Sequence, residues 1–372
     1  MQKPIVIFIT NYPENHVISE RARIFSKSIS DIAIIKVLYR ERNIGRIKSF
    51  WSRLYILNKN PPNLIFTFDG FISTELPTFI ASIFYKVPYI CDTACDIYDE
   101  YKIKDKRLIK FLSYKIFHLI LRRAKVITCR GLIQKIVFES RYLNKNIIHV
   151  SEGVIYDKWQ ENSMIKKDEL FNNVENPLII GVIGSIVWDE NLGWAYGLEV
   201  IEVLKRLRFK NICGLVLPSP TSSGAAIKML NEIALKYDLQ NKFKIIDNVH
   251  RDILPNYLAT IDICISTQIP NIIGEMRTTA KLPEYMAAGR YILATKVGDA
   301  RFYLHKDMLI EYESSGKYYD ELSKRVDCIE KNREKLLDGR LNKAKAKSNF
   351  SYEYLIPIVR EEIEKILFQS KL

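Results

Sequence analysis

The sequence predicts an α/β protein made of two doubly wound, Rossmann-like domains. Short apolar runs rich in β-branched residues alternate with longer segments of helical periodicity, a pattern typical of parallel α/β units. The chain of 372 residues is longer than one average domain, and a polar passage at residues 157–176 interrupts the alternation near its middle. We therefore expect an N-terminal domain over residues 1–165 and a C-terminal domain over residues 176–350.

Each domain offers six candidate strands, chosen for their short apolar composition. In the first domain the strands are expected at residues 5–9, 32–37, 64–68, 89–91, 126–129 and 147–150, and the clearest helices at 19–29, 74–85 and 107–123. In the second domain the strands are expected at residues 178–183, 214–217, 243–246, 263–266, 291–294 and 308–312. Open parallel sheets bind ligands outside the carboxyl ends of their strands, so we expect a site in a cleft between the two domains.

The composition points to anionic partners. The 56 Lys and Arg residues outnumber the 43 Asp and Glu residues, which gives a formal net charge of +13. Nucleotide phosphates, nucleic acid and an anionic membrane surface would all suit this excess. Nucleic acid is not expected, because the chain has neither a zinc-finger spacing nor an RNA-binding aromatic signature.

The cysteine and hydropathy patterns bear on the compartment. Six cysteines in 372 residues are too few for a disulfide framework and suit a reducing environment. No apolar run approaches the roughly 18 residues of a membrane-spanning helix. We therefore expect a cytoplasmic protein that is soluble or lies on a membrane surface. None of the five histidines forms a metal-ligand spacing, and no metal is expected.

The segment from Arg277 to Thr295 carries the most chemical information. Thr278 or Thr279 can cap a helix whose N-terminal amides attract a phosphate. Lys281 and Glu284 are three residues apart and therefore lie on one helix face. A cation beside the amides suits a diphosphate, and a carboxylate one turn later suits a pair of ribose hydroxyls. From the spacing alone, a solvated Lys–Glu pair on an ordinary amphipathic helix is an equally good interpretation.

The same segment resembles a known family. The letters KLPEYMAAGRYILAT, followed by Gly298 and Asp299, are similar to the nucleotide-sugar signature of GT-B glycosyltransferases, close to retaining family 4. Four weaker similarities extend over most of the chain: NIIHVSEGVIYDKW at 146–159, LIIGVIGSI at 178–186, ILPNYLATIDICIST at 253–267 and NFSYEYL at 349–355. The resemblance implies the GT-B architecture, in which the last helix, residues 353–372, packs back on the N-terminal domain.

The resemblance assigns donor-binding roles, with one departure. It implies that Glu284 binds the ribose hydroxyls of a nucleoside diphosphate sugar. Family members usually carry a second carboxylate eight residues earlier, where this chain has Met276. Glu275, one residue out of register, is the candidate substitute.

A second departure concerns the diphosphate. The family commonly places an Arg and a Lys after the glycine turn that opens the C-terminal domain, but residues 185–193 contain neither. If a diphosphate binds, its countercharge should come from Arg277 and Lys281, together with backbone amides near Gly184 and Ser185.

A third departure lies on the acceptor side. In the stretch YICDTACDIYDEY at residues 89–101, Cys95 stands beside Asp96 where the family has a histidine near an aspartate. Asp96 is the expected catalytic residue, which would orient or deprotonate an acceptor hydroxyl. Asp92 and Asp99 are more easily interpreted as a helix cap and a solvated loop.

Two other polar residues follow predicted strands. His16 lies in the loop after the first strand and is a candidate for substrate binding, although a loop or cap role is the more economical interpretation. Asp69, in FTFDGF, also follows a strand, and its role is open in the same way.

A basic amphipathic helix is expected between Tyr101 and Lys125. This stretch holds nine Lys or Arg residues against one acid, Asp105, with aromatic and aliphatic residues interleaved. It could face an anionic membrane, as membrane-attached members of the resembled family do with a basic N-terminal face. It could equally be a core-packed helix with a solvated basic rim.

The resemblance implies a retaining, metal-independent glycosyltransferase that acts on a glycan or lipid-linked acceptor, as in the synthesis of surface polysaccharides or glycoconjugates. The missing family residues also leave open a non-catalytic GT-B subunit that scaffolds an active partner. A nucleotide-sugar epimerase is a third hypothesis.

Overall fold

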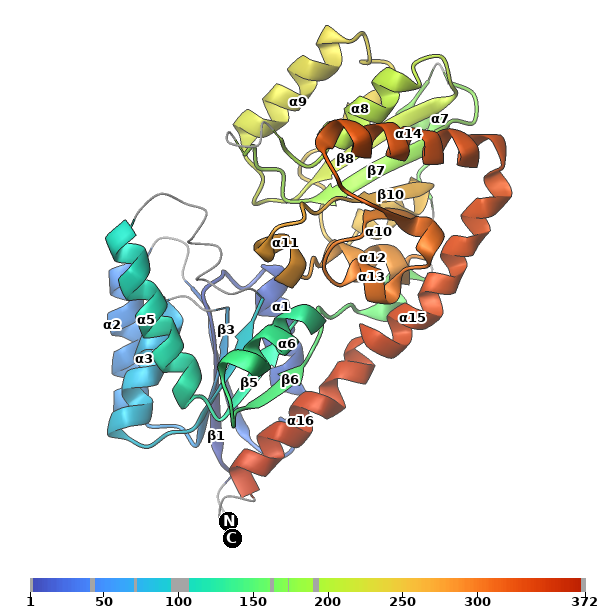
Figure 1. The fold of residues 1–372 in the computed structure, drawn as a ribbon. Coiled ribbons are helices and arrows are strands. Elements are labelled where there is room, and N and C mark those ends of the chain that lie inside the picture. The colour runs from blue at the N-terminus through green and yellow to red at the C-terminus, as the bar shows by residue number, and fades with distance from the viewer. Residues whose placement is uncertain are drawn as a thin grey trace. The chain divides into compact units, whose positions relative to one another are not determined.

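The computed structural model describes residues 3–40, 44–69, 72–94, 107–160, 164–172, 174–189 and 194–368. The chain forms two compact units: Met1–Gly153, Asn271–Thr278 and Tyr352–Leu372 make the first, and Val154–Pro270 and Thr279–Ser351 make the second. Each unit contains one six-stranded parallel sheet with helices packed on it (Figure 1). The predicted class, two doubly wound α/β domains, is confirmed.

The first unit has the strand order β2-β1-β3-β4-β5-β6. Its strands are β1 (Ile5–Thr10), β2 (Ile34–Leu38), β3 (Leu64–Phe68), β4 (Tyr89–Thr93), β5 (Val126–Cys129) and β6 (Asn146–His149). Its helices are α1 (Val17–Lys27), α2 (Arg46–Lys59), α3 (Ile72–Phe84), α5 (Arg107–Arg123), α6 (Leu132–Arg141), α11 (Ile272–Met276) and α16 (Tyr352–Phe368). The strands agree with the predicted ones to within two residues at each end.

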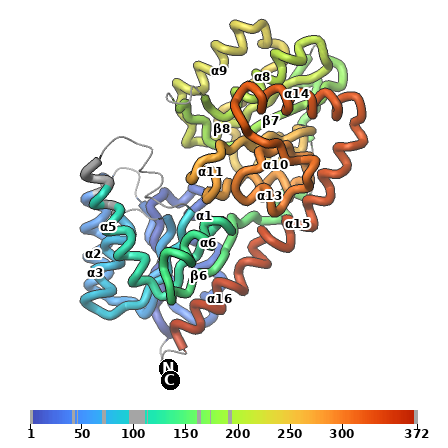
Figure 2. The backbone as a smooth tube through the Cα atoms, in the orientation of Figure 1, coloured from blue at the N-terminus to red at the C-terminus, as the bar shows by residue number. Residues whose placement is uncertain are grey.

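Alternation along the strands produces two cores, one on each face of this sheet. Val6 and Phe8 of β1 pack with α1 and α16, whereas Ile7 and Ile9 face the side covered by α2, α3, α5 and α6. On the first face, Phe25 of α1 meets the buried aromatic side chains of β3. On the second face, α2, α3 and α5 lie side by side as one layer, as the tube in Figure 2 also shows.

The last helix belongs to the first unit. Five side chains of α16 are part of the core that contains α1 and β1: Tyr352, Leu355, Val359, Ile363 and Leu367. The ring of Tyr352 meets that of Phe25 edge-on at 5.8 Å. The Tyr352 ring also lies directly against the backbone at Gly153. A side chain there would clash with the ring, because a Cβ would lie 2.4 Å from it.

The second unit has the strand order β12-β11-β10-β7-β8-β9. Its strands are β7 (Leu178–Gly184), β8 (Ile212–Pro218), β9 (Phe243–Ile245), β10 (Ile263–Ser266), β11 (Tyr291–Thr295) and β12 (Leu309–Ile310). Its helices are η1 (Tyr156–Trp159), α7 (Lys167–Leu170), α8 (Leu198–Arg206), α9 (Gly224–Lys236), α10 (Leu254–Thr260), α12 (Lys281–Ala287), α13 (Ala300–Tyr303), η2 (Lys306–Met308), α14 (Ser315–Lys331), η3 (Arg333–Arg340) and α15 (Leu341–Asn349).

The strand order places a topological switch point in each sheet. In the first unit the chain passes from β1 to β2 on one side and continues at β3 on the other. In the second unit it passes from β7 to β8 and β9 on one side and continues at β10 on the other. Ligands of open α/β sheets bind outside the carboxyl ends of the strands at such points.

Across the described ranges, no helix combines the length and apolar character that crossing a bilayer would require.

Candidate functional site

In the second unit, the carboxyl end of β7 opens at a glycine. Gly184 ends the strand with φ of 118°, a left-handed conformation that favours glycine. Its carbonyl accepts a hydrogen bond from the Ser219 amide at 2.9 Å. The following residue, Ser185, is exposed. The chain thus turns sharply at the switch point and leaves Ser185 accessible to a ligand.

Lys281 lies beside this turn. It is the first residue of α12, only 8% exposed, and its Cε is 4.0 Å from the position that a Cβ on Gly184 would occupy. Its ammonium Nζ lies 3.4 Å from the centroid of the Tyr196 ring. The structure therefore brings together Lys281 and Gly184, which the sequence predicted as parts of one site.

The predicted helix cap is wrong. The residue before α12 is Ala280, whose side chain makes no cap hydrogen bond, so neither Thr278 nor Thr279 caps this helix. Thr279 contributes instead through its backbone carbonyl, which accepts a hydrogen bond from the Leu282 amide at 3.2 Å. Ala280 itself has helical backbone angles, φ of −58° and ψ of −25°, and not the extended backbone typical of a side-chain cap.

A buried carboxylate, Glu199, lies near Lys281. Its two oxygens accept hydrogen bonds from the Gly197 amide at 2.9 Å and from the Thr267 hydroxyl at 3.2 Å. Burial raises the pKa of Glu199, and the Lys281 cation acts in the opposite direction. Because Thr267 follows β10, this carboxylate connects α8 to the second strand of the switch point.

Glu284 follows Lys281 by one turn and is 6% exposed. Its Oε1 accepts a hydrogen bond from Arg251 Nη2 at 2.9 Å. Arg251, in the loop before α10, therefore brings a second cation to the same helix face as Lys281. The stretch 185–193 had lacked both expected basic residues, and Arg251 supplies basic charge from elsewhere in the chain.

The other two donor-side candidates belong to the first unit, although the sequence placed them in the C-terminal domain. Glu275 is half-buried in the short helix α11, and Arg277 is exposed directly after it. Within the first unit, α11 packs against α6. Met276, at the usual position of the first carboxylate of the family, is buried.

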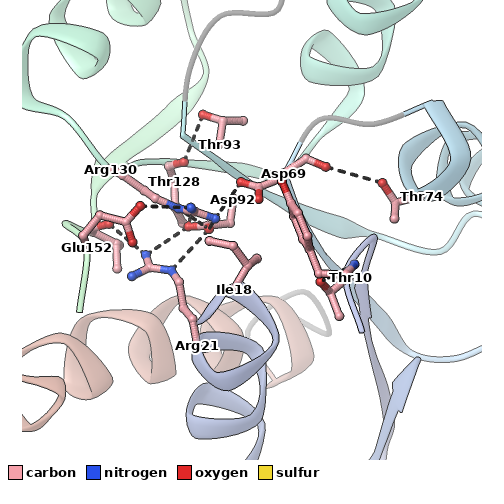
Figure 3. A network of polar contacts seen from close by, with 12 residues as sticks. Thr10, Ile18, Arg21, Asp69, Thr74, Asp92, Thr93, Thr128, Arg130 and Glu152 are labelled. Atoms are coloured by element: carbon pink, nitrogen blue, oxygen red, sulfur yellow. Dashed lines mark hydrogen bonds and ion pairs between the residues drawn. The ribbon is translucent and has the colours of Figure 1, made fainter. Parts of the chain in front are cut away.

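In the first unit, charged side chains gather at the carboxyl ends of the strands (Figure 3). We call this group the arginine–carboxylate cluster, and it consists of Arg21, Arg130, Asp69, Asp92 and Glu152. Both guanidinium groups bond to Asp92: Arg21 Nη2 lies 3.0 Å from Oδ1, and Arg130 Nε lies 2.8 Å from Oδ2. All five side chains are almost completely buried.

Asp92 corrects one sequence interpretation. It is the fourth residue of β4, completely buried in the cluster, and is neither a helix cap nor part of a solvated loop. The Thr128 hydroxyl also donates to its Oδ1, at 2.6 Å. Burial alone would raise the pKa of Asp92, but the Arg130 and Arg21 cations together lower it below its usual value. Asp92 is therefore a charged structural anchor.

Asp69 occupies the edge of the cluster. It follows β3 with φ of 58°, and Arg130 Nη2 lies 2.8 Å from its Oδ1. Burial raises the pKa of Asp69 to about 6, against the opposing effect of Arg130.

The two remaining acceptor-side candidates have different outcomes. Asp96 lies outside the described residues, as do Cys95 and Asp99. His16 is the N-cap of α1: its Nδ1 accepts a hydrogen bond from the Ile18 amide at 3.2 Å, and its ring stacks on Tyr12 at 3.9 Å. Its position supports the cap interpretation. Within the described ranges, no three His, Cys, Asp or Glu side chains gather as a metal site requires.

The basic helix lies in the layer of α2, α3 and α5. Part of α5 is core, because Phe117, Ile120 and Leu121 are buried. The described side chains of this layer include large exposed apolar ones: Ile47, Trp51 and Tyr55 on α2, Ile83, Phe84 and Tyr85 at the end of α3, and Phe111, Leu112 and Leu119 on α5. Among the described residues of the three helices, Glu75 is the one acid, and it is buried.

Two Rossmann-like parallel sheets of this strand order, one in each unit, are typical of the GT-B class of fold. Structural comparison bears this out. The chain is similar to a sucrose-phosphate synthase from Thermosynechococcus elongatus, with a TM-score of 0.75 and 13% identity over 99% of this chain and 100% of that one. It is also similar to HepE from Anabaena in complex with UDP-glucose, with a TM-score of 0.73 and 14% identity over 97% and 99% of the two chains.

A third similar structure is a candidate UDP-N-acetylglucosamine 2-epimerase from Listeria monocytogenes. Its TM-score is 0.66, with 8% identity over 99% of this chain and 98% of that one. No family model and no curated protein matches the chain. At these identities the similarity shows the GT-B fold and leaves the reaction to be argued from the residues.

Sequence reasoning missed several residues of both groups. Tyr196, Glu199 and Arg251 lie 30 to 85 positions before Lys281, at no recognisable spacing. Arg21 and Arg130 are similarly distant from Asp92. One available signal was that Arg130 directly follows a predicted strand, which places it at the same sheet edge as Asp92 and Asp69.

Proposed function

We propose that the chain is a glycosyltransferase that moves a sugar from a nucleoside diphosphate donor to a hydroxyl group of a glycan or lipid-linked acceptor. The observation that carries the proposal is the pairing of Lys281 with Gly184 at the switch point of the second sheet. A cation that is largely desolvated beside an open glycine turn can stabilise the negative charge that develops on a departing diphosphate.

The donor would be held by the second unit. Lys281 and the backbone amides of Gly184 and Ser185 would contact the diphosphate, and Glu284 would accept hydrogen bonds from the ribose hydroxyls. Arg251, which now bonds to Glu284, would orient that carboxylate. HepE binds UDP-glucose, which favours a uridine nucleotide as the first donor to test.

Arg277, Glu275, Asp96 and His16 would act from the first unit. We propose that Arg277 adds countercharge to the diphosphate, Glu275 contacts the donor sugar and Asp96 orients or deprotonates the acceptor hydroxyl. His16 would act indirectly, because it caps α1 and so holds the loop between β1 and that helix. The transfer would proceed with retention and without a metal, as the family resemblance implies.

We further propose that the protein works in the cytoplasm at an anionic membrane, in the synthesis of surface polysaccharide or glycoconjugate. The layer of α2, α3 and α5 supports this partner because apolar side chains that could insert into lipid accompany basic ones. Lys48, Lys59, Lys115, Arg122 and Arg123 are all exposed on it. Each basic residue near anionic lipid contributes about 1 kcal/mol.

The test is to follow UDP-glucose and GDP-mannose by proton NMR with the full chain, in the presence and absence of octyl β-D-glucoside. A transferase releases the nucleoside diphosphate and forms a new glycosidic bond only when the glucoside is present. Retention gives the product the anomeric configuration of the donor. Donor binding without any conversion of the tested pairs would favour a non-catalytic subunit.

An epimerase is the second candidate function, because a candidate epimerase is among the similar structures. In the same experiment it would change the sugar signals of the donor without the glucoside and without release of the nucleotide. Conversion of that kind would contradict the transferase proposal.

A further inference from the structure

The switch point of the first sheet is lined by polar residues that the donor argument does not use. Asn11 follows β1 and Asp69 follows β3, the two strands between which the chain changes direction. The side chain of Asn11 is held in place, because its Oδ1 accepts a hydrogen bond from the Ser73 hydroxyl at 2.8 Å. Among the described residues, Oδ1 of Asp69 accepts no such hydrogen bond, and Asp69 lies where ligands of open α/β sheets bind.

The charge balance of the arginine–carboxylate cluster leaves one carboxylate in excess. Two guanidinium groups, Arg21 and Arg130, face three carboxylates. Asp92 receives hydrogen bonds from both arginines, and Glu152 Oε1 receives one from Arg130 Nη1 at 3.1 Å. Asp69 receives no hydrogen bond from either arginine and meets Arg130 as an ion pair, with 2.8 Å between Nη2 and Oδ1.

The hydrogen bonds that the described residues make around Asp69 leave one of its carboxylate oxygens unsatisfied. Arg130 Nη2 is within ion-pair distance of Asp69 Oδ1, but it directs its hydrogen bond to Asp92 Oδ2 at 2.5 Å. Among the described residues, no group donates a hydrogen bond to Asp69 Oδ1, although that atom is buried. A buried acceptor without a donor is a strong reason to expect a ligand hydroxyl or a water there.

A neighbouring carboxyl group is also unsatisfied. Glu75 of α3 is 1% exposed, and within the described part of the chain its Oε1 has no hydrogen-bond partner. Burial raises the pKa of Glu75 well above its usual value, and the charge of Asp69 raises it further. Both effects favour the neutral form of Glu75.

The backbone holds Asp69 in place for this role. Its amide donates to the Asp92 carbonyl at 2.9 Å, and its own carbonyl accepts a hydrogen bond from the Thr74 hydroxyl at 3.4 Å. Figure 3 shows Asp69 between these two partners at the edge of the cluster. The backbone of Asp69 is fixed from both sides, while among the described residues its Oδ1 has no hydrogen-bond donor.

We propose that Asp69 is the acceptor-binding carboxylate of the first unit, which accepts a hydrogen bond from a hydroxyl group of the carbohydrate acceptor. This inference rests on the proposed glycosyltransferase function and adds an acceptor-binding residue to Asp96, which is proposed to orient or deprotonate the reacting hydroxyl. A carboxylate suits this ligand because a charged acceptor forms a stronger bond with a hydroxyl than a neutral one does.

Saturation-transfer-difference NMR with octyl β-D-glucoside tests the assignment on the full chain, with and without UDP. We expect ring-proton signals of the glucoside in the wild type and a loss of affinity of about 10-fold or more in Asp69→Asn, since a hydrogen bond to a charged group is removed. Glu139→Gln, an exposed carboxylate on α6 that pairs with Lys135, is the matched control and should bind as the wild type does.

The pH dependence provides a readout that a merely structural role would not change. Asp69 faces Arg130 after β5, Asp92 from β4, Glu152 after β6, Arg21 from α1 and Glu75 from α3. With the pKa of Asp69 raised to about 6, glucoside binding should increase as the pH rises through 6. The increase should be absent in Asp69→Asn.

Two results would overturn the assignment: equal glucoside signals in the wild type and Asp69→Asn, or no glucoside signal in either protein. The proposed donor function is examined separately on the same samples by the stabilisation that UDP produces. If UDP has no effect but the glucoside result depends on Asp69, the donor proposal fails and the Asp69 assignment stands.

Discussion

The Lys281 ammonium lies 3.4 Å from the centroid of the Tyr196 ring, with the stem of the side chain against Gly184. The aromatic face and the nearby Glu199 carboxylate hold this cation in a largely buried position. Placing a cation in advance reduces the cost of ordering it when an anion binds. Lys281 is therefore the residue on which donor binding should depend most.

Replacing Lys281 should weaken nucleotide binding. We expect Lys281→Ala to lose about 10-fold to 100-fold in affinity for UDP, because a charge-assisted hydrogen bond contributes about 1.5–3 kcal/mol. Lys281→Arg should retain part of the affinity by keeping the charge. Isothermal titration calorimetry measures both variants. Lys324→Ala, an exposed lysine on α14, is the control, and an equal loss there would contradict the assignment.

Asp92 should be a stability residue. Asp92→Asn removes the charge that balances two buried guanidinium groups, and breaking a buried ion pair costs about 3–5 kcal/mol. Urea denaturation of the wild type and the variant would measure the loss in the free energy of unfolding. Asp31→Asn, at an exposed pair with Arg360, should cause a far smaller loss. Similar losses in the two variants would show that the cluster is not the anchor of this sheet edge.

Asp69 should lower stability at neutral pH. Its pKa is about 6 in the folded chain against 3.8 in the ordinary state, so the folded protein binds this proton more tightly than the unfolded chain does. The tighter proton binding by Asp69 stabilises the folded state fully below pH 4. This stabilisation, about 3 kcal/mol in total, is lost as the pH rises to 6. Asp69→Asn removes the dependence and leaves the cluster with two cations and two carboxylates.

The measurement is the difference in unfolding free energy between the wild type and Asp69→Asn from pH 4 to pH 8. We expect the variant to gain relative to the wild type as the pH rises through this range. A difference that is constant with pH would contradict the raised pKa of Asp69.

Vesicle binding should depend on the layer of α2, α3 and α5. The wild type should bind vesicles of phosphatidylglycerol and phosphatidylcholine in co-sedimentation, and binding should weaken as sodium chloride increases because salt screens the basic side chains. Replacing Trp51, which is 61% exposed, and Phe84 with serine should reduce binding. Phe209→Ser removes a 92% exposed aromatic side chain from the second unit and should have no effect. Equal binding to pure phosphatidylcholine vesicles would contradict an anionic partner.

The sequence was sufficient to predict the fold, because the fold depends on local patterns. The runs that became β3, β5 and β10 and the helix α5 have the predicted bounds, since composition and periodicity act within each segment. The cap of α12 was predicted wrongly because Thr278 and Thr279 are good capping residues, but the backbone enters the helix one residue later, at Ala280. Cap geometry depends on how the preceding chain is packed.

The sites were predictable only in part. Lys281 and Glu284 share one turn of helix, so their common face follows from spacing alone. The same face is also reached, from other elements, by Arg251, Glu199 and Tyr196. The strand order brings these residues there, and strand order cannot be predicted from the pattern within a single segment. Asp92 was misinterpreted for the same reason, since its partners Arg21 and Arg130 lie on α1 and after β5.

The central claim is that the second unit binds a nucleoside diphosphate at Lys281 and Glu284, and a thermal-shift panel tests it most directly. UDP, GDP, ADP, CDP and dTDP would be added to the wild type, Glu284→Ala and the control Lys324→Ala. At about 100 times its dissociation constant, a bound ligand adds roughly 2.7 kcal/mol of stability. We predict a raised melting temperature with one nucleotide, preserved in Lys324→Ala and lost in Glu284→Ala. No shift with any of the five, or an undiminished shift in Glu284→Ala, would contradict the donor site.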